Sequence, residues 1–295
     1  MYIISKNVMK LLLFSLFFLQ ISFIVSANER RIAITIDDAP MPSTHLFSGI
    51  ERTKRIIQGL EQENAIAGIF VLGTHLLDDT GKERITLYDQ AGHIIGNHTY
   101  SHYMCKKISA DKFIDGIQKT HELIKNYQNF KLLFRYPYLD ECGNKTKKLQ
   151  VQEALEKLKY QNAYVTIVTL DYHFNHLLQK ALRHGKKINY DKLKQIYLNT
   201  TLEYIDFYSS FIDEKLGYSA PHSLLLHEND INALYLPNLI HILKTQGWQI
   251  IPPQEVYENN EIVSKVKTII KTRPNIPSFS TSYIDKLFYS EVIQE

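Results

Sequence analysis

Carboxylates, imidazoles and a guanidinium stand directly after short apolar runs of this chain. These polar residues are Asp37 and Asp38, His98 with His102 close behind, Arg135, Asp171 and His227. Carboxylates and imidazoles bind divalent metals and transfer protons near neutral pH. Each residue alone has an ordinary explanation, but its repeated placement after an apolar run indicates one shared site.

Asp37-Asp38 is the first of these groups. An isolated Asp pair most often caps the N-terminus of a helix. Alternatively, the backbone turns at the end of the strand, so that both carboxylates approach one metal site. One carboxylate would then bind the metal, and the other would take a proton from water.

His98 and His102 are four residues apart, a spacing that brings both imidazoles to one side of a helix or tight loop. Two unrelated surface or core histidines would show the same spacing, so this pattern alone is weak. Together with Asp38 it becomes a set of two imidazoles and one carboxylate with room for water and substrate. Such a set is typical of catalytic zinc and also suits Co²⁺ or Mn²⁺.

The remaining polar residues have roles that complete a hydrolytic site. Arg135 could pair with a surface acid, or it could keep Asp37 oriented and ionised. Pro137 fixes the backbone, so that Tyr138 could present its N–H to a developing oxyanion. Asp171 could cap a helix, or it could keep His227 protonated as a general acid. We expect His227 to lie on a strand distant from that of Asp37, so that it faces Asp37 across the mouth of the barrel.

The elements that must position these residues alternate between short apolar runs and helical patterns. Strands are expected at residues 32–36, 67–72, 93–96, 132–134, 164–170, 223–226 and 248–251, and helices at 48–63, 83–91, 109–124, 147–158, 190–211 and 236–244. Continuous apolar runs between helices favour a parallel sheet covered on both faces. The number of repeats predicts an α/β fold, a distorted barrel whose strand ends open on one catalytic face.

Composition excludes several classes of protein. The 295 residues carry a formal charge of +3, too small for a nucleic-acid-binding surface, so no nucleic-acid partner is expected. The hydrophobic share of 44% is enough for a sizeable core, and 2 Cys are too few for a disulfide-stapled miniature fold. Oligomeric state cannot be read from these features.

The N-terminal residues 1–27 have the layout of a secretory signal peptide. Lys6 and Lys10 precede an apolar run, and Val25-Ser26-Ala27 offers small residues for cleavage. An uncleaved membrane anchor is the alternative. We therefore expect an exported protein, periplasmic or secreted, with no stable membrane span after cleavage, a domain over residues 28–257 and a C-terminal tail over 258–295.

The ordered motifs resemble those of polysaccharide deacetylases (carbohydrate esterase family 4, NodB homology domains). The matching segments are residues 35–40, 96–102, 135–138, 170–172 and 225–227. The resemblance implies a single catalytic domain, a distorted (β/α)7 barrel, and metal-dependent removal of acetyl groups from an acetylated glycan. The resemblance implies that Asp37 is the general base, and that Zn²⁺ or another divalent metal is bound by Asp38, His98 and His102. It also implies that Arg135 orients Asp37 and that Tyr138 stabilises the oxyanion. His227 would then be the general acid, supported by Asp171.

This sequence departs from the family pattern at Ala39, Val168 and Tyr172, where Gly, a further acid and Trp are usual. None of these changes removes a metal ligand or the base. Cys105 and Cys142 follow the second and third motifs. They could form a disulfide or remain two free thiols. A thiolate ligand to the metal is the least favoured alternative.

Three other functions compete with glycan deacetylation: a catalytically silent carbohydrate-binding protein of the same fold, a metal-dependent hydrolase of another C–N bond or of a phosphoester, and a structural or adhesive protein. Retention of Asp37 and all three ligands favours an enzyme over a silent protein. The glycan itself, chitin-like or peptidoglycan-like, is not specified by these residues.

Overall fold

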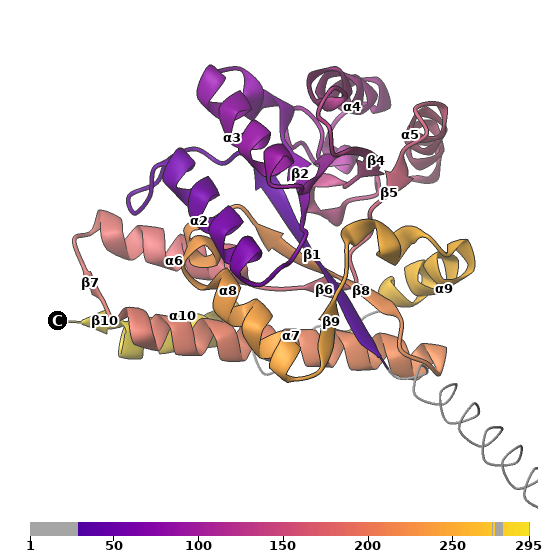
Figure 1. Cartoon of the computed structure of the whole chain (residues 1–295). Helices are drawn as coiled ribbons and strands as arrows, with labels where there is room; N and C mark the ends of the chain where they lie inside the picture. Colours follow the sequence, from indigo (N-terminus) through magenta and orange to yellow (C-terminus); the bar gives the residue numbers. More distant parts are fainter. Residues whose placement is uncertain (1–28, 273, 275–279, 295) are drawn as a thin grey trace, which may run out of the picture.

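The fold is built on one parallel sheet, seen in a computed structural model that describes residues 29–272, 274 and 280–294 (Figure 1). The expected signal peptide, residues 1–27, lies outside the described residues. The sheet has the order β5-β4-β3-β2-β1-β8-β6, and β9 pairs with the start of β1. Its strands are β1 (Arg30–Ala39), β2 (Gly68–Val71), β3 (Ile94–Asn97), β4 (Phe130–Phe134), β5 (Gln161–Asn162), β6 (Ile167–Val168), β8 (Pro221–His227) and β9 (Trp248–Ile250).

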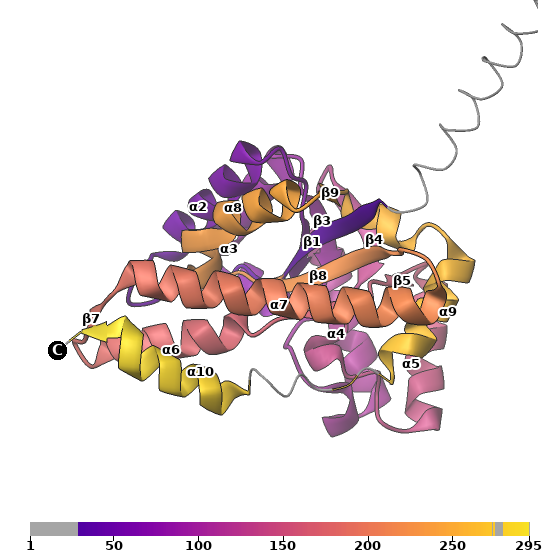
Figure 2. The same ribbon diagram turned by 90° about the horizontal axis from the view of Figure 1, so that it is seen from below.

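Helices cover both faces of this sheet, as a parallel sheet requires. They are α2 (Gly49–Gln62), α3 (Asp79–Gln90), α4 (Ala110–Ile124), α5 (Lys145–Lys157), α6 (Asp171–Arg183), α7 (Tyr190–Leu216), α8 (Asp230–Thr245), α9 (Asn260–Ile270) and α10 (Thr281–Leu287). Short 3₁₀ turns are η2 (Gly73–Leu76), η3 (Cys105–Lys107), η4 (Pro137–Leu139) and η5 (Pro253–Tyr257), and η6 (Phe288–Val292) is a π-helical turn. Figure 2 shows α7 running along the molecule beside α6 and α10.

The predicted distorted (β/α)7 barrel is confirmed, and its distortion is a break in the wall. Within the described residues, β5 and β6 do not pair with each other, so the sheet stays open between them. The segment between them continues the pairing at single points: the N–H of Ala163 bonds to Phe134 O, and that of Thr166 to Ser223 O. The single strand predicted over 164–170 is confirmed only at Ile167–Val168, which form β6; the residues before it cross from one edge of the sheet to the other.

The core forms on both faces of β1. Ile32, Ile34 and Ile36 are fully buried in one large cluster, while Ala33 belongs to a second cluster on the opposite side. Alternate residues of a strand point to opposite faces, so a strand buried on both faces must be apolar throughout. The run 32–36 is accordingly apolar except for Thr35, whose buried hydroxyl donates to Leu224 O (2.7 Å).

Side-chain caps set the first residues of helices α8 and α4, and one of these starts differs from the prediction. Helix α8 begins at Asp230 rather than at 236, because Asn229 caps it by accepting a hydrogen bond from the N–H of Asn232 (3.0 Å), and Pro237 lies inside it. Helix α4 begins as the sequence indicates, with Ser109 accepting from the N–H of Lys112 (3.3 Å).

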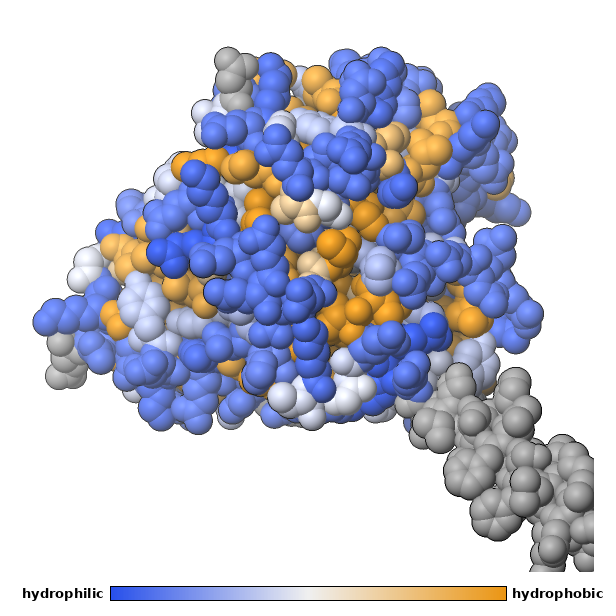
Figure 3. Space-filling model, in the orientation of Figure 1, coloured by the Kyte–Doolittle hydropathy of each residue, from blue (hydrophilic) through white to orange (hydrophobic). Residues whose placement is uncertain are grey.

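The region after Pro253 forms helices that pack on the barrel. Val263 and Val266 of α9 are buried in one core cluster, and Ile284 of α10 in the other. Strand β10 (Ile293–Gln294) then pairs antiparallel with β7 (Lys187–Ile188). Figure 3 shows hydrophilic residues over most of one face, with apolar residues between them near its middle. Among the residues described, none of the helices combines the length and apolar character needed to span a membrane.

Candidate active site

A cleft of about 620 Å³ opens at the carboxyl ends of the strands. It brings together residues that are far apart in the sequence and that the sequence predicted for one mouth. The lining includes Asp37, Asp38, His98, His102, Tyr138 and His227, with Met41, Leu139, Val168, Thr169, Tyr172, Asn175, Leu225 and Asn229. Arg135 and Asp171 are buried, and each bonds to a residue of this lining.

Asp38, His98 and His102 form a compact cluster with the composition of a metal site. Asp38 Oδ1 lies 3.4 Å from His98 Nε2 and 3.1 Å from His102 Nε2, and one ligand atom from each residue lies within 4.8 Å of the others. Burial alone would raise the pKa of Asp38, but its interactions with His98, and the charges of His227 and His102, hold that pKa well below the ordinary range. Burial lowers the pKa of His102 to about 4. The cluster therefore favours an ionised carboxylate beside a neutral imidazole, the protonation states that bind metals.

The donor set fits a divalent cation. Asp38 Oδ1 is buried and accepts no hydrogen bond from the described residues, although both imidazoles approach it. The other ring nitrogen of His98, Nδ1, lies 2.9 Å from the carbonyl oxygen of Arg135, which fixes the tautomer that leaves Nε2 free. Two imidazoles and one carboxylate match the ligands that catalytic zinc uses, with further positions left for water and substrate.

Asp37 is held at the edge of this cluster by Arg135. Arg135 Nη1 lies 3.1 Å and 3.3 Å from the two carboxylate oxygens of Asp37, and both side chains are almost fully buried. Arg135 is itself fixed by Thr35 Oγ1 (3.2 Å) and by stacking 4.3 Å above the ring of Phe70. Asp37 Oδ2 is 3.7 Å from His98 Nε2, so an oriented carboxylate lies next to the candidate metal position.

His227 and Asp171 form the second buried charge pair of the cleft. His227 Nδ1 lies 2.9 Å from Asp171 Oδ1, while Asp171 Oδ2 accepts from the backbone N–H of His227 and from the amides of Asn229 and Asn232. Burial lowers the pKa of His227, but Asp171 outweighs this and raises it to about 10. Asp171 therefore favours the cationic form of His227, and because Nδ1 is bonded to Asp171, Nε2 is the ring nitrogen that remains available.

The position of His227 corrects one expectation. Strand β8 is the direct neighbour of β1, and His227 is in register with Asp37. The two residues therefore do not face each other from distant strands across the mouth. Residues in register on adjacent parallel strands lie side by side, and each of these two side chains bonds to a different partner, Arg135 for Asp37 and Asp171 for His227.

The site contains unusual backbone. Asp38, His102 and Tyr138 have positive φ values of 68°, 54° and 55°, a region that side chains other than glycine rarely adopt. Tyr138 stands in η4 after Pro137, with its ring 58% exposed and 4.5 Å from the ring of His102. Such strain persists only where surrounding structure imposes it, and it is common at functional sites.

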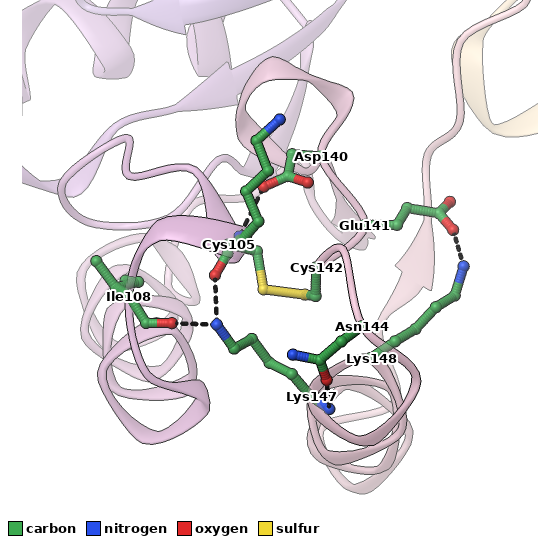
Figure 4. The surroundings of a disulfide bond; sticks show 9 residues. Cys105, Ile108, Asp140, Glu141, Cys142, Asn144, Lys147 and Lys148 are labelled. Carbon is green, nitrogen blue, oxygen red and sulfur yellow. Dashed lines mark hydrogen bonds and ion pairs between the residues drawn. A yellow bond between two sulfur atoms is a disulfide. The ribbon is translucent and has the colours of Figure 1, made fainter.

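A disulfide joins the loops that carry His102 and Tyr138. Cys105 and Cys142 are fully buried and bonded, with their Cα atoms 4.5 Å apart (Figure 4). Around the bond, the backbone N–H of Lys106 donates to Asp140 (2.7 Å). Both cysteines are thus engaged with each other, so neither is a ligand in the cluster of Asp38, His98 and His102.

Four buried charged residues near the cleft escaped the sequence analysis. Glu228 accepts from Arg84 Nη2 (2.5 Å), and Asp230 from Arg52 Nε (2.7 Å), in pairs that exclude water almost completely. Both arginines also donate to Met41 O, and Glu228 accepts from Met41 N, which fixes the loop after β1. Glu228 and Asp230 flank Asn229 just after His227, and that run of polar residues behind an apolar strand is the signal that could have revealed them.

Comparison with known proteins supports the resemblance to polysaccharide deacetylases. The sequence profile of the family described as "Polysaccharide deacetylase" matches residues 25–163, a little under half of this chain. Solved structures share the fold: a "T48 deacetylase with substrate" superimposes with a TM-score of 0.53 at 20% identity, over 78% of this chain and 91% of that one. A family 4 carbohydrate esterase described as a pseudoenzyme aligns with a TM-score of 0.51 at 18% identity, over 76% of this chain and 66% of that one.

Two similar proteins of known activity carry peptidoglycan in their names. The peptidoglycan-N-acetylglucosamine deacetylase of Bacillus cereus is 31% identical over 121 residues, 41% of this chain and 40% of that protein. The peptidoglycan-N-acetylmuramic acid deacetylase PdaC of Bacillus subtilis is 29% identical over 115 residues, 39% of this chain and 22% of that protein. The matches thus cover well under two thirds of either relative.

Proposed function

We propose that this protein is a metal-dependent hydrolase that removes acetyl groups from an N-acetylated glycan, of the chitin or peptidoglycan type. The observation that carries the proposal is the convergence in one cleft of the Asp38–His98–His102 cluster, an Arg-held Asp37 and an Asp-held His227. The names of the two bacterial relatives support an N-acetylated sugar as the substrate.

Asp38, His98 and His102 would hold the cation, with zinc as the first choice and Co²⁺ or Mn²⁺ as alternatives. A divalent cation at this position supplies Lewis acidity toward water and toward the acetyl carbonyl oxygen. The remaining chemistry belongs to the side chains and backbone of the cleft.

Hydrolysis of an amide needs two proton transfers, one from the attacking water and one to the departing amine. Asp37, oriented by Arg135, would take a proton from the attacking water. His227, kept cationic by Asp171, would give a proton to the departing amine of the sugar. The N–H of Tyr138 would donate to the oxygen of the tetrahedral intermediate, since the exposed η4 turn lies against the ring of His102.

Export is part of the same proposal. Polymeric glycans of this type are reached outside the cytoplasm, and the Cys105–Cys142 disulfide supports an oxidising compartment. Residues 1–27 would serve as the cleaved signal, residues 28–257 as the deacetylase domain, and residues 258–295 as an extension on it.

The proposal is tested by acetate release from N-acetylglucosamine oligomers. Protein stripped with a chelator and reloaded with Zn²⁺, Co²⁺ or Mn²⁺ should regain activity, and His98→Ala should lose most of its bound metal and most of its turnover. The matched control is His184→Ala, an exposed imidazole at the end of α6 that bonds to Lys180 O outside the cleft. Full metal occupancy in a folded His98→Ala, His102→Ala double variant would refute the ligand assignment.

A metal-loaded protein that binds the glycan but releases no acetate would identify a catalytically silent member of the family instead. Acetate release from aryl acetates alone, without any from glycans, would point to another hydrolase substrate. Both outcomes contradict the proposed activity in distinguishable ways.

A further inference from the structure

A second cavity, of about 260 Å³, lies at the open seam of the barrel. Its walls are the segment 162–165, which crosses between β5 and β6, the end of the η4 loop, and one face of helix α9. The break in the sheet creates this space, because no strand fills the gap between β5 and β6 among the described residues. Figure 1 shows α9 on the β5 side of the sheet.

This cavity adjoins the catalytic cleft. Leu139 lines both, and Arg135 lines the cavity while its guanidinium holds Asp37 on the cleft side. The crossing segment also contributes to both spaces, with Val165 in the cavity and Val168 in the cleft. The cavity and the cleft therefore share Leu139 as a common wall, which we take as the path from a bound sugar to the cavity.

The charge of the cavity is positive. Lys267, half-buried, and Lys271 line it, and among the described residues neither ammonium forms an ion pair. The cavity's acid, Glu141, is already engaged: it pairs with Lys148 and accepts from Asn162 Nδ2 (3.0 Å). The Lys267 ammonium lies over the ring of Tyr164, 5.7 Å from its centroid, and Glu141 is the nearby carboxylate, although it is bonded to Lys148 and Asn162. Burial lowers the pKa of Lys267, and the charge of Glu141 offsets this only in part.

We propose that Lys267 and Lys271 bind a carboxylate on the glycan, so that the preferred substrate is an N-acetylated glycan with acid-substituted sugars. This inference rests on the proposed function. A volume of about 260 Å³ equals roughly nine water molecules, room for a small acidic substituent but not for a long polymer. Lysines suit this role because ammonium groups attract carboxylates without requiring a fixed bidentate geometry.

The test compares one glycan with and without its carboxylates. The probes are a tetrasaccharide of alternating N-acetylglucosamine and N-acetylmuramic acid, the same tetrasaccharide as its methyl ester, and the neutral N-acetylglucosamine tetramer. The double variant Lys267→Gln, Lys271→Gln should lose about tenfold in kcat/KM on the free acid, and little on the ester or the tetramer. Raising the salt concentration should reduce the preference for the free acid, because exposed charges are screened.

Two variants separate charge from structure. Lys265→Gln is the matched control, since Lys265 is on the same helix but exposed and paired with Glu261 (2.7 Å). The Lys267→Arg, Lys271→Arg variant keeps the charge and should keep most of the preference. Equal kcat/KM on free acid and ester, or equal losses on all probes in the Gln variant, would overturn the inference while leaving the deacetylase proposal intact.

If no glycan releases acetate, the proposed function fails, and calorimetric binding still tests the lysine site. The wild-type protein should then bind the free-acid tetrasaccharide more tightly than its methyl ester, and the Gln variant should bind both alike. Equal affinity of the wild-type protein for acid and ester would overturn the inference in that case too.

Discussion

Removing the Cys105–Cys142 disulfide should destabilise the fold by about 4 kcal/mol. The bond closes a loop with a sequence separation of 37 residues. In the chain-entropy treatment, closing a loop of that length removes about 13 cal/mol/K from the unfolded ensemble, which corresponds to about 4 kcal/mol at 25 °C. The perturbation is the double variant Cys105→Ala, Cys142→Ala, because alanine leaves no buried hydroxyl or thiol without a partner.

The assay is equilibrium unfolding in urea, with wild-type and variant protein compared at the same pH and metal content. The free energy of unfolding should fall by about 4 kcal/mol, and the m-value should rise, because the unfolded chain without the crosslink exposes more surface. Wild-type protein in a reductant should match the variant, whereas the reductant should leave the variant unchanged.

The same variant should bind its metal more weakly, because His102 precedes Cys105 by only three residues and Tyr138 precedes Cys142 by four. Without the crosslink, the loop that holds the left-handed backbone of His102 must be ordered when the metal binds. A stability loss below about 1 kcal/mol with an unchanged m-value would refute the entropic reasoning. Unchanged metal affinity would refute the proposed link between the disulfide and the site.

Two further predictions concern buried charge. Glu228→Gln should lower the free energy of unfolding by about 3–5 kcal/mol, because it leaves the Arg84 guanidinium buried without its anion. The double variant Glu228→Gln, Arg84→Met should lose less stability than the sum of the two single variants. Unfolding in urea measures both effects. The pKa of His227, raised to about 10, means that its contribution to stability is fully present below the ordinary value of about 6.5 and is lost as the pH rises through about 10. NMR titration of the imidazole should show this raised pKa. Asp171→Asn should lower it, because the effect of burial is then opposed only by the more weakly acting charges of Asp38 and Asp37. An unchanged pKa in that variant would contradict the pairing.

The sequence located most of the candidate site because the site lies where strands end. Apolar runs mark the strands of a parallel sheet, and the first polar residues after them must emerge on one face. That reasoning placed Asp37, His98 and His227 in one cleft, as the structure has them, with Arg135 buried beside Asp37.

The features that escaped prediction depend on long-range pairing. Arg52 and Arg84 look like exposed residues of amphipathic helices, and only the packing of α2 and α3 against the segment after β8 shows that they are buried on Glu228 and Asp230. The crossing between β5 and β6 was read as one strand, because an apolar run carries no information about which neighbour it pairs with. The disulfide was left open for the same reason.

The open seam of the barrel also bears on edge-to-edge association between copies of this protein. An unclosed sheet has two free edges, and a free edge is a template on which a second chain can add a strand. Here both edge strands, β5 and β6, are only 2 residues long, and the sheet's longer strands lie inside it. An incoming chain would therefore find almost no ladder to extend, so that the gap beside the cleft can stay accessible without promoting fibre growth.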